Sequence, residues 1–276
     1  MKQILSSKEL DAQLNQKGFV VVPFLHKDEV QELRTFFEDN HRQDIPSFYA
    51  TAHALNVDFR KKMNEKIREV FERSINNYFQ NCKPLGGSFI VKSNKGSQIL
   101  NAHQDWNIVD ESQFRSFNIW VPLLDLTSQN GAIAVIPESH HWVTNFRGPN
   151  IPDDFQEYSS QLWNMLETLE MKAGEALIYD HRLFHASHAN NSTELRLACV
   201  YGIIPDEAEM FYYFGNENQI EQYESNVDFF MNGNIQQGNE ILKKIESFEK
   251  PKLNLRHLPF QIEKLQKKSF FKRWFS

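Results

Sequence analysis

The chain has 276 residues, a formal net charge of −6 at pH 7, 41% hydrophobic residues and 24% charged residues. This composition is typical of a globular protein with a sizeable core, and it excludes a disordered or fibrous chain. The two cysteines, Cys82 and Cys199, are too few for a disulfide scaffold or a Cys-ligated zinc site. The net acidity argues against a nucleic-acid-binding protein, which normally presents a basic face.

The sequence shows neither a secretory signal nor a membrane span. Residues 1–14 carry a polar or charged side chain every two or three positions, unlike the apolar run of a signal peptide. No apolar stretch reaches the roughly 18 residues that a transmembrane helix needs. Together with the low cysteine count, these features predict a cytoplasmic protein.

The first 80 residues are predicted to form helices around one strand. Ser6 and Glu9 have the spacing of a capping box, and Gly18 is suited to the C-terminal end of the helix that they begin. Apolar residues at helical spacing follow later in this region. The predicted elements are a helix over 6–18, a strand over 19–22 that stops at Pro23, and helices over 27–41 and 57–79.

From Gly86 onwards the pattern changes to short runs of β-forming residues separated by turn residues. These predicted strands cover 88–91, 117–124, 132–136, 176–179 and 197–204. Many short strands at this spacing predict a barrel or sandwich, so the fold class is mainly β with flanking helices. Residues 205–248 are polar and weakly periodic, and we interpret them as an irregular or helical elaboration of a single domain over 1–248.

The C-terminal tail, residues 249–276, differs from the rest of the chain in charge. It holds eight Lys or Arg residues against Glu249 and Glu263, and five aromatic residues lie among them. Such a segment can contact an anionic membrane surface, a phosphate-bearing carrier or an acidic partner. The alternative is a helix that packs its aromatic residues on the domain, and the uneven amphipathic pattern favours this alternative.

Three residues have the types and positions of a metal site. His103-Gln104-Asp105 is an H-x-D triplet beside a predicted strand, where side chains two positions apart point to the same side. About 80 residues later, His185 follows the predicted strand over 176–179. Two histidines and one carboxylate on one face of an octahedron leave positions open, as non-haem Fe(II) oxygenases require.

The order of motifs around these residues resembles the phytanoyl-CoA dioxygenase family, whose members are Fe(II)/2-oxoglutarate oxygenases built on a double-stranded β-helix. The resemblance covers residues 18–204. Its motifs lie at 18–23, 102–106, 120–123, 130–140, 174–177 and 185–190, and Arg196 follows eleven residues after His185. One departure is Glu138, which stands where the family often has Gly.

The resemblance implies a binding site for 2-oxoglutarate. Arg196 is the expected partner of the far carboxylate, since a guanidinium forms two parallel hydrogen bonds with a carboxylate. Ser187, two residues after His185, is expected to assist. Trp120 and Lys92 are further candidates to line this pocket. A core role for Trp120 is an equal alternative, and for Lys92 a solvated position at the end of a strand is the favoured interpretation.

Three more residues are assigned to the surroundings of the site. His188 is a rival to His185 as third metal ligand, but the offsets of Ser187 and Arg196 favour His185. Asn190 is expected to fix the loop rather than bind the metal. Trp106 is expected either to wall the substrate cavity or to pack in the core.

The sequence thus predicts an Fe(II)- and 2-oxoglutarate-dependent dioxygenase that uses O₂ to hydroxylate a small or carrier-bound metabolite, with release of succinate and CO₂. Asp105 favours hydroxylation, desaturation or cyclisation over halogenation, because halogenating relatives carry a small residue there. One alternative is a non-catalytic β-helix protein that binds or senses a ligand. Another is a metal-dependent cupin enzyme that does not use 2-oxoglutarate. The complete set of His103, Asp105, His185 and Arg196 disfavours both.

Overall fold

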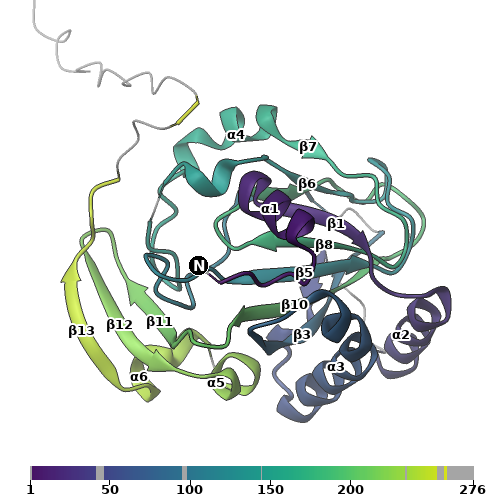
Figure 1. Ribbon diagram of the computed structural model, residues 1–276, viewed down its shortest axis with the longest axis horizontal. Helices are drawn as coiled ribbons and strands as arrows, with labels where there is room; N and C mark the ends of the chain where they lie inside the picture. The colour runs from purple at the N-terminus through teal and green to yellow at the C-terminus, as the bar shows by residue number, and fades with distance from the viewer. Residues whose placement is uncertain are drawn as a thin grey trace, which may run out of the picture.

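The computed structural model describes residues 2–41, 47–94, 98–143, 145–233, 235–253 and 258–259. A six-stranded antiparallel sheet forms its centre (Figure 1). In spatial order, its strands are β1 (Phe19–Pro23), β8 (Glu175–Asp180), β5 (Phe117–Pro122), β10 (Arg196–Pro205), β3 (Cys82–Lys92) and β2 (Phe48–Ala50). In the described part of the chain, no helix is both long and apolar enough to cross a membrane.

The N-terminal helices cover one face of this sheet. They are α1 (Lys8–Lys17), α2 (Lys27–Asn40) and α3 (Val57–Tyr78), with the 3₁₀ turn η1 (Thr51–His53) between α2 and α3. Their apolar sides join alternate strand residues in the largest hydrophobic core, which includes Leu33, Phe71 and Phe89. Because strand side chains alternate between faces, the other residues of these strands point into the barrel interior.

A second, four-stranded sheet faces the first across that interior. Its order is β4 (Leu100–His103), β9 (His185–Ser187), β6 (Ile133–Val135) and β7 (Glu167–Thr168). Trp120, Leu177 and Ala198 of the large sheet pack with Ile133 and Val135 of the small one. The outer face of this sheet is covered by η2 (Ser139–His141), η3 (Gln156–Tyr158) and α4 (Ser159–Met165). The prediction of a mainly β fold with flanking helices is confirmed.

Two details of the N-terminal prediction are resolved by the structure. The first helix begins after Ser7, whose side chain accepts a hydrogen bond from Leu10 N, so the predicted cap at Ser6 is displaced by one residue. Gly18 ends this helix in the left-handed conformation, with φ of 83°, as the sequence predicted.

Residues 205–248 form a third sheet, and the prediction of an irregular or helical elaboration was wrong. The strands β11 (Met210–Gly215), β12 (Gln219–Ser225) and β13 (Lys244–Glu249) pair antiparallel, accompanied by α5 (Val227–Asn232), η4 (Ile235–Gln237) and α6 (Gly238–Ile241). A register shift between Gln222 and Tyr223 breaks the alternation of β12, and β13 is mostly exposed. These two features remove the alternating pattern by which a strand is recognised.

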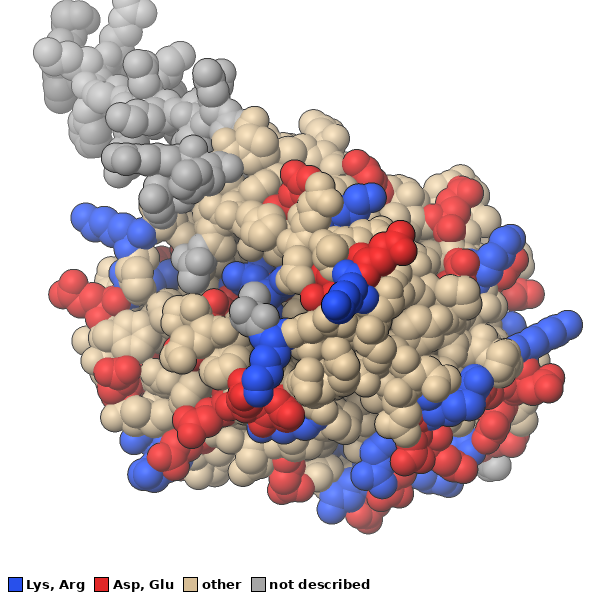
Figure 2. Space-filling model, in the orientation of Figure 1, with Lys and Arg blue, Asp and Glu red and all other residues tan. Residues whose placement is uncertain are grey.

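The prediction for the tail over 249–276 falls largely outside the described residues. On the face shown in Figure 2, Lys and Arg side chains mix with Asp and Glu side chains.

Candidate metal centre and co-substrate cavity

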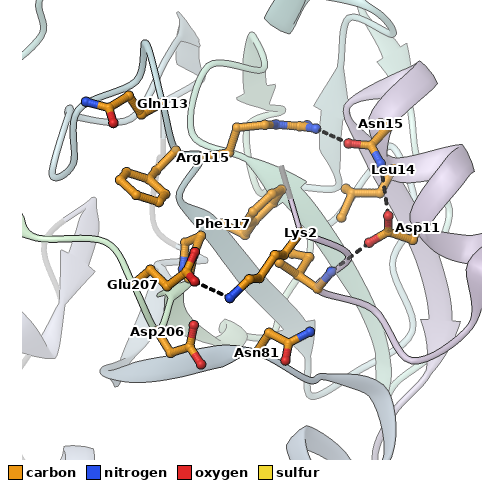
Figure 3. A pocket seen from close by; sticks show the side chains of 13 residues that line it. Lys2, Asp11, Leu14, Asn15, Asn81, Gln113, Arg115, Phe117, Asp206 and Glu207 are labelled. Atoms are coloured by element: carbon orange, nitrogen blue, oxygen red, sulfur yellow. Dashed lines mark hydrogen bonds and ion pairs between the residues drawn. The ribbon is translucent and has the colours of Figure 1, made fainter.

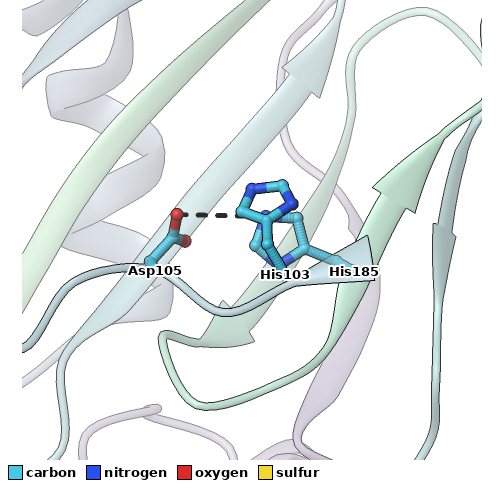
Figure 4. Close-up of side chains that lie close together, drawn as sticks. All are labelled: His103, Asp105 and His185. Atoms are coloured by element: carbon cyan, nitrogen blue, oxygen red, sulfur yellow. Dashed lines mark ion pairs between the residues drawn. The ribbon is translucent and has the colours of Figure 1, made fainter. Parts of the chain in front are cut away.

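Three predicted ligands meet between the two facing sheets (Figure 4). His103 ends β4 and pairs with His185 at the start of β9, and Asp105 follows two residues after His103. One potential ligand atom from each of the three lies within 4.8 Å of the others. His185 Nε2 is 3.9 Å from Asp105 Oδ1. The pairing of β4 with β9 therefore brings together residues that are far apart in the sequence.

Backbone carbonyls orient both imidazole rings. His103 Nδ1 lies 2.8 Å from Asn101 O, and His185 Nδ1 lies 3.0 Å from Leu183 O. A hydrogen bond from Nδ1–H to a carbonyl fixes the tautomer in which Nε2 carries the free lone pair. Burial, followed by the nearby His103, lowers the pKa of His185 to about 4, so this ring is neutral at physiological pH. Neutral imidazole is the form that binds a metal.

Asp105 is ionised and its carboxylate is fixed in orientation. Burial alone would raise the pKa of Asp105, but His185, His181 and His103 together with a hydrogen bond from Asn118 lower this pKa to about 2. Asn118 Nδ2 donates to Asp105 Oδ2 at 2.9 Å. Oδ1 is therefore the oxygen directed to His185. Two imidazoles and one carboxylate match the donor set that binds Fe(II).

Asn118 and Tyr179 are site residues that the sequence analysis missed. Asn118 Nδ2 lies 3.4 Å from the Tyr179 hydroxyl, and both residues line the same cavity as the three ligands. Burial, and then the charge of Asp105, raise the pKa of Tyr179 well above its usual value, so the hydroxyl stays protonated. Asn118 and Trp120 are two positions apart on one strand and therefore lie on the same face of the sheet. This spacing was the sequence feature from which Asn118 could have been predicted to lie in the cavity with Trp120.

The cavity beside the three ligands has a volume of about 200 Å³ and reaches Arg196 and Ser187. Arg196 is 1% exposed. Its Nε and Nη1 atoms and the hydroxyl of Ser187 are buried without hydrogen-bond partners in the described structure. Burial lowers the pKa of Arg196 to about 9, which leaves it charged at neutral pH. A buried cation without a partner is costly. The cavity therefore fits an anionic group, such as a carboxylate, between the guanidinium and the hydroxyl.

Lys92 is fully buried, which contradicts the interpretation of a solvated strand-end lysine. On the paired strands β3 and β10, its backbone position lies opposite that of Arg196. Its ammonium group donates to the carbonyls of Gln98 at 3.1 Å, Ser187 at 3.2 Å and His188 at 2.6 Å. These bonds tie β3 to the end of β9, which begins with His185. Lys92 thus lies behind the cavity with its side-chain N–H groups directed to carbonyl oxygens.

Of the other candidates named above, Trp120 lines the cavity, whereas His188 and Asn190 make contacts elsewhere. Trp120 lines the cavity, and the Arg196 guanidinium carbon lies 5.4 Å from the centre of its ring. His188 Nε2 lies 2.7 Å from the Thr168 hydroxyl, so this ring points away from the three ligands. Asn190 is buried, and its side chain donates to Lys92 O and Glu194 O, which holds the loop before β10.

Trp106 is not among the described residues that line the cavity. Its carbonyl lies 3.2 Å from Nδ1 of His181, a buried histidine that the sequence analysis did not single out. The Asp105 N–H donates to the His181 carbonyl at 2.9 Å. His181 therefore helps to hold the backbone of the H-x-D segment.

A second cavity of about 460 Å³ lies between α1, the start of β5 and the loop around Glu207 (Figure 3). Arg115 reaches from its wall to Asn15 and pairs with buried Asp180. The described residues that line this cavity include none of the three ligands. Asp180, the partner of Arg115, directly follows Tyr179, which lines the cavity beside the three ligands.

The model of the phytanoyl-CoA dioxygenase (PhyH) family matches residues 14–198, which is more than half of the chain. The chain belongs to the phytanoyl-CoA dioxygenase family. This family of Fe(II)/2-oxoglutarate-dependent oxygenases is the one that the order of sequence motifs indicated.

A curated relative is Dioxygenase FUM3 of Gibberella moniliformis, with 25% identity over 139 residues. That match covers 46% of this chain and 42% of FUM3, so the chain spans less than half the length of this relative.

Solved structures share the fold. The non-haem α-ketoglutarate-dependent carbocyclase SnoK of nogalamycin biosynthesis is 16% identical, with a TM-score of 0.57 over 74% of this chain and 86% of SnoK. The epimerase SnoN, in complex with Fe³⁺, α-ketoglutarate and nogalamycin RO, is 19% identical, with a TM-score of 0.51 over 74% of this chain and 85% of SnoN. The predicted double-stranded β-helix is thus confirmed.

Proposed function

We propose that this protein hydroxylates an unactivated C–H bond of a small or carrier-bound metabolite, using Fe(II), 2-oxoglutarate and O₂ and releasing succinate and CO₂. One observation carries the proposal. A single cavity is lined both by a cluster of two histidines and one carboxylate and by a buried arginine, Arg196, whose Nε and Nη1 atoms lack hydrogen-bond partners in the described structure. A dicarboxylate that chelates a metal with one end and meets a guanidinium with the other fits this arrangement.

His103, Asp105 and His185 would hold the iron. Three protein ligands on one face leave coordination positions for the co-substrate and dioxygen. The bound metal and co-substrate supply the oxidising chemistry, and the protein supplies position and charge. Asn118 keeps Oδ2 of Asp105 occupied, so the carboxylate presents its other oxygen to the metal.

Arg196 and Ser187 would bind the far carboxylate of 2-oxoglutarate, and Trp120 would pack against its chain. Lys92 lies fully buried behind them and would add a second positive charge by taking up a proton when the dianion binds. Because Arg196, Ser187 and Lys92 are buried, their electrostatic attraction for the dianion would be stronger than at an exposed site in water.

The carboxylate of Asp105 favours transfer of a hydroxyl group over halogenation, since a halide would need its coordination position. Ring closure or epimerisation is the second candidate outcome, because the carbocyclase SnoK and the epimerase SnoN have the same fold. These outcomes share the metal centre and the co-substrate and differ in the product formed.

The test is dioxygen-dependent conversion of 2-oxoglutarate to succinate by the Fe(II)-loaded protein without substrate, compared with Asp105→Ala and with Arg73→Lys, a surface control. We expect wild type and Arg73→Lys to form succinate slowly, and Asp105→Ala, which lacks one of the three ligands, to form none. A wild-type protein that binds metal but neither binds nor consumes 2-oxoglutarate would instead support a cupin enzyme of another kind. Binding of both without succinate would support a binding module.

A further inference from the structure

We propose that Arg147 is a positioning residue for the metal ligand Asp105, and that the sheet β11–β13 holds Arg147 in place. The inference rests on the proposed function, because it takes Asp105 as a ligand. The family match ends at residue 198, so the sheet lies outside the part of the chain that defines the family.

The first observation is a direct contact between Arg147 and the ligand's backbone. Arg147 Nε donates to the carbonyl oxygen of Asp105 at 2.6 Å. The backbone N–H of Asp105 donates to His181 O at 2.9 Å, and its side chain is held by Asn118. Asp105 is thus held at its amide, its carbonyl and its carboxylate, and Arg147 supplies the carbonyl contact.

The second observation is that Arg147 is itself held rigidly. Its two terminal nitrogens bind both oxygens of Glu111, at 3.1 and 2.6 Å, and Nη1 also donates to Asn145 O at 2.9 Å. The side chains of Arg147 and Glu111 are 8% and 3% exposed. A buried ion pair contributes little net stability, because desolvation offsets the attraction. The clear effect of this ion pair is geometric. The carboxylate of Glu111 fixes the plane of the guanidinium group and therefore the direction of Nε.

The third observation is that β11 contacts both segments joined by Arg147. Phe211 N donates to Ile108 O at 2.9 Å, so β11 is bonded to the segment after Asp105. On the other side, the ring centre of Phe146 lies 5.1 Å from that of Tyr213 and 5.1 Å from that of Phe248. A Cβ atom at Gly148 would collide with Tyr213 O. The residues before and after Arg147 are therefore packed against the sheet.

The arrangement is a chain of contacts from the sheet to the metal site. Tyr213 and Phe248 hold Phe146, the backbone of Arg147 follows, and its guanidinium reaches Asp105. Figure 1 shows β11–β13 as a separate layer at one side of the two facing sheets. Partners of this kind orient ligands, and their loss commonly weakens metal binding about 10- to 100-fold.

The experiment measures Co(II) binding by calorimetric titration and the visible absorption of the bound Co(II), which reports its coordination geometry. The first variant is Arg147→Lys, which keeps the positive charge but removes the planar guanidinium group and its several N–H donors. The second is the double variant Arg147→Met with Glu111→Leu, which removes the ion pair and leaves apolar groups of similar size, so the fold is retained. Arg73→Lys, which breaks a two-pronged contact with Glu29 on the surface, is the matched control. The thermal midpoint of each protein is measured in a chelator.

We expect both Arg147 variants to bind Co(II) about 10- to 100-fold more weakly and to change its absorption, while Arg73→Lys matches wild type. A folded double variant that binds Co(II) with wild-type affinity and spectrum would overturn the role of Arg147. If wild type itself binds no Co(II), the proposed function fails, and the inference fails with it.

The role of the sheet is tested separately by Phe146→Ala, with Tyr223→Phe in the same sheet as control. Phe146→Ala removes the ring that packs on Tyr213 and Phe248, and it should weaken Co(II) binding by about tenfold. Unchanged binding in this variant, with weakened binding in Arg147→Lys, would overturn the role of the sheet and leave that of Arg147.

Discussion

Arg196 and Lys92 occupy paired positions on β10 and β3, and both side chains are fully buried. Burial, and then the charge of Arg196, lower the pKa of Lys92 to about 7, while three carbonyl acceptors favour its charged form. Two buried cations side by side repel each other, and an anion between the strands and the metal removes that repulsion. We therefore expect this pair of buried residues to favour the binding of an anion in the cavity.

The first prediction concerns the pH dependence of 2-oxoglutarate binding. Above about pH 7, Lys92 is largely neutral in the free protein and takes up a proton when the dianion binds, so affinity should fall as pH rises, by up to about tenfold per pH unit. Titration of 2-oxoglutarate into Co(II)-loaded protein at several pH values measures this. In Lys92→Met the slope above about pH 7 should vanish. A slope that persists in Lys92→Met would assign the proton to another group.

Asn118 should be needed for tight metal binding. Asn118→Leu removes the hydrogen bond to Asp105 Oδ2, which frees the carboxylate to rotate, and we expect Co(II) affinity to fall about 10- to 100-fold. Asn232→Ala is the control, because Asn232 on helix α5 also donates to an aspartate, Asp228, but this hydrogen bond is exposed and far from the three ligands in the sequence. Equal Co(II) affinities in Asn118→Leu and wild type would contradict the role assigned to Asn118.

The turn before η2 stores backbone strain at Glu138. This exposed residue has φ of 64°, in the left-handed region that glycine adopts without a Cβ clash. Glu138→Gly should therefore raise the free energy of unfolding by about 1 kcal/mol. Denaturant unfolding measures the change. Glu138→Ala keeps the Cβ atom and should bring no such increase, so stabilisation by both variants would point to a different cause.

His140 should make the fold sensitive to acid. Burial, opposed in part by Asp180, lowers its pKa to about 4, against 6.5 when it is exposed. Between these values the unfolded chain binds more protons than the folded one, so the free energy of unfolding should fall as pH falls from about 6.5 to about 4. Denaturant unfolding across this range should show a shallower pH dependence for His140→Gln. The same dependence in both proteins would exclude His140 as the source.

The metal cluster and its order along the chain were predictable because each depends on local residue types. The H-x-D triplet, His185 and the eleven-residue offset of Arg196 are visible without a structure. The first three elements were also predictable, because Gly18 and the apolar spacing of the helices mark them locally.

What surrounds the ligands was not predictable, because it depends on contacts between distant segments. Asn118 reaches Asp105 only when β5 lies beneath the loop after β4, and Arg147 reaches it from 42 residues further along the chain. Lys92 was expected at the surface because nothing local shows that the carbonyls of Gln98, Ser187 and His188 accept hydrogen bonds from it. The sheet β11–β13 was missed because a shifted register and an exposed edge hide the strand pattern.

The most direct test of the proposed Fe(II) and 2-oxoglutarate site is to add both compounds, without oxygen, to wild type and to Arg196→Met. The visible absorption spectrum of each mixture is then measured. A 2-oxoglutarate chelated to Fe(II) in an open three-ligand site gives a weak charge-transfer band. We expect this band in wild type, and in Arg196→Met we expect it only at much higher 2-oxoglutarate concentration. If wild-type protein that has bound Fe(II) shows no such band, the proposed 2-oxoglutarate site is contradicted.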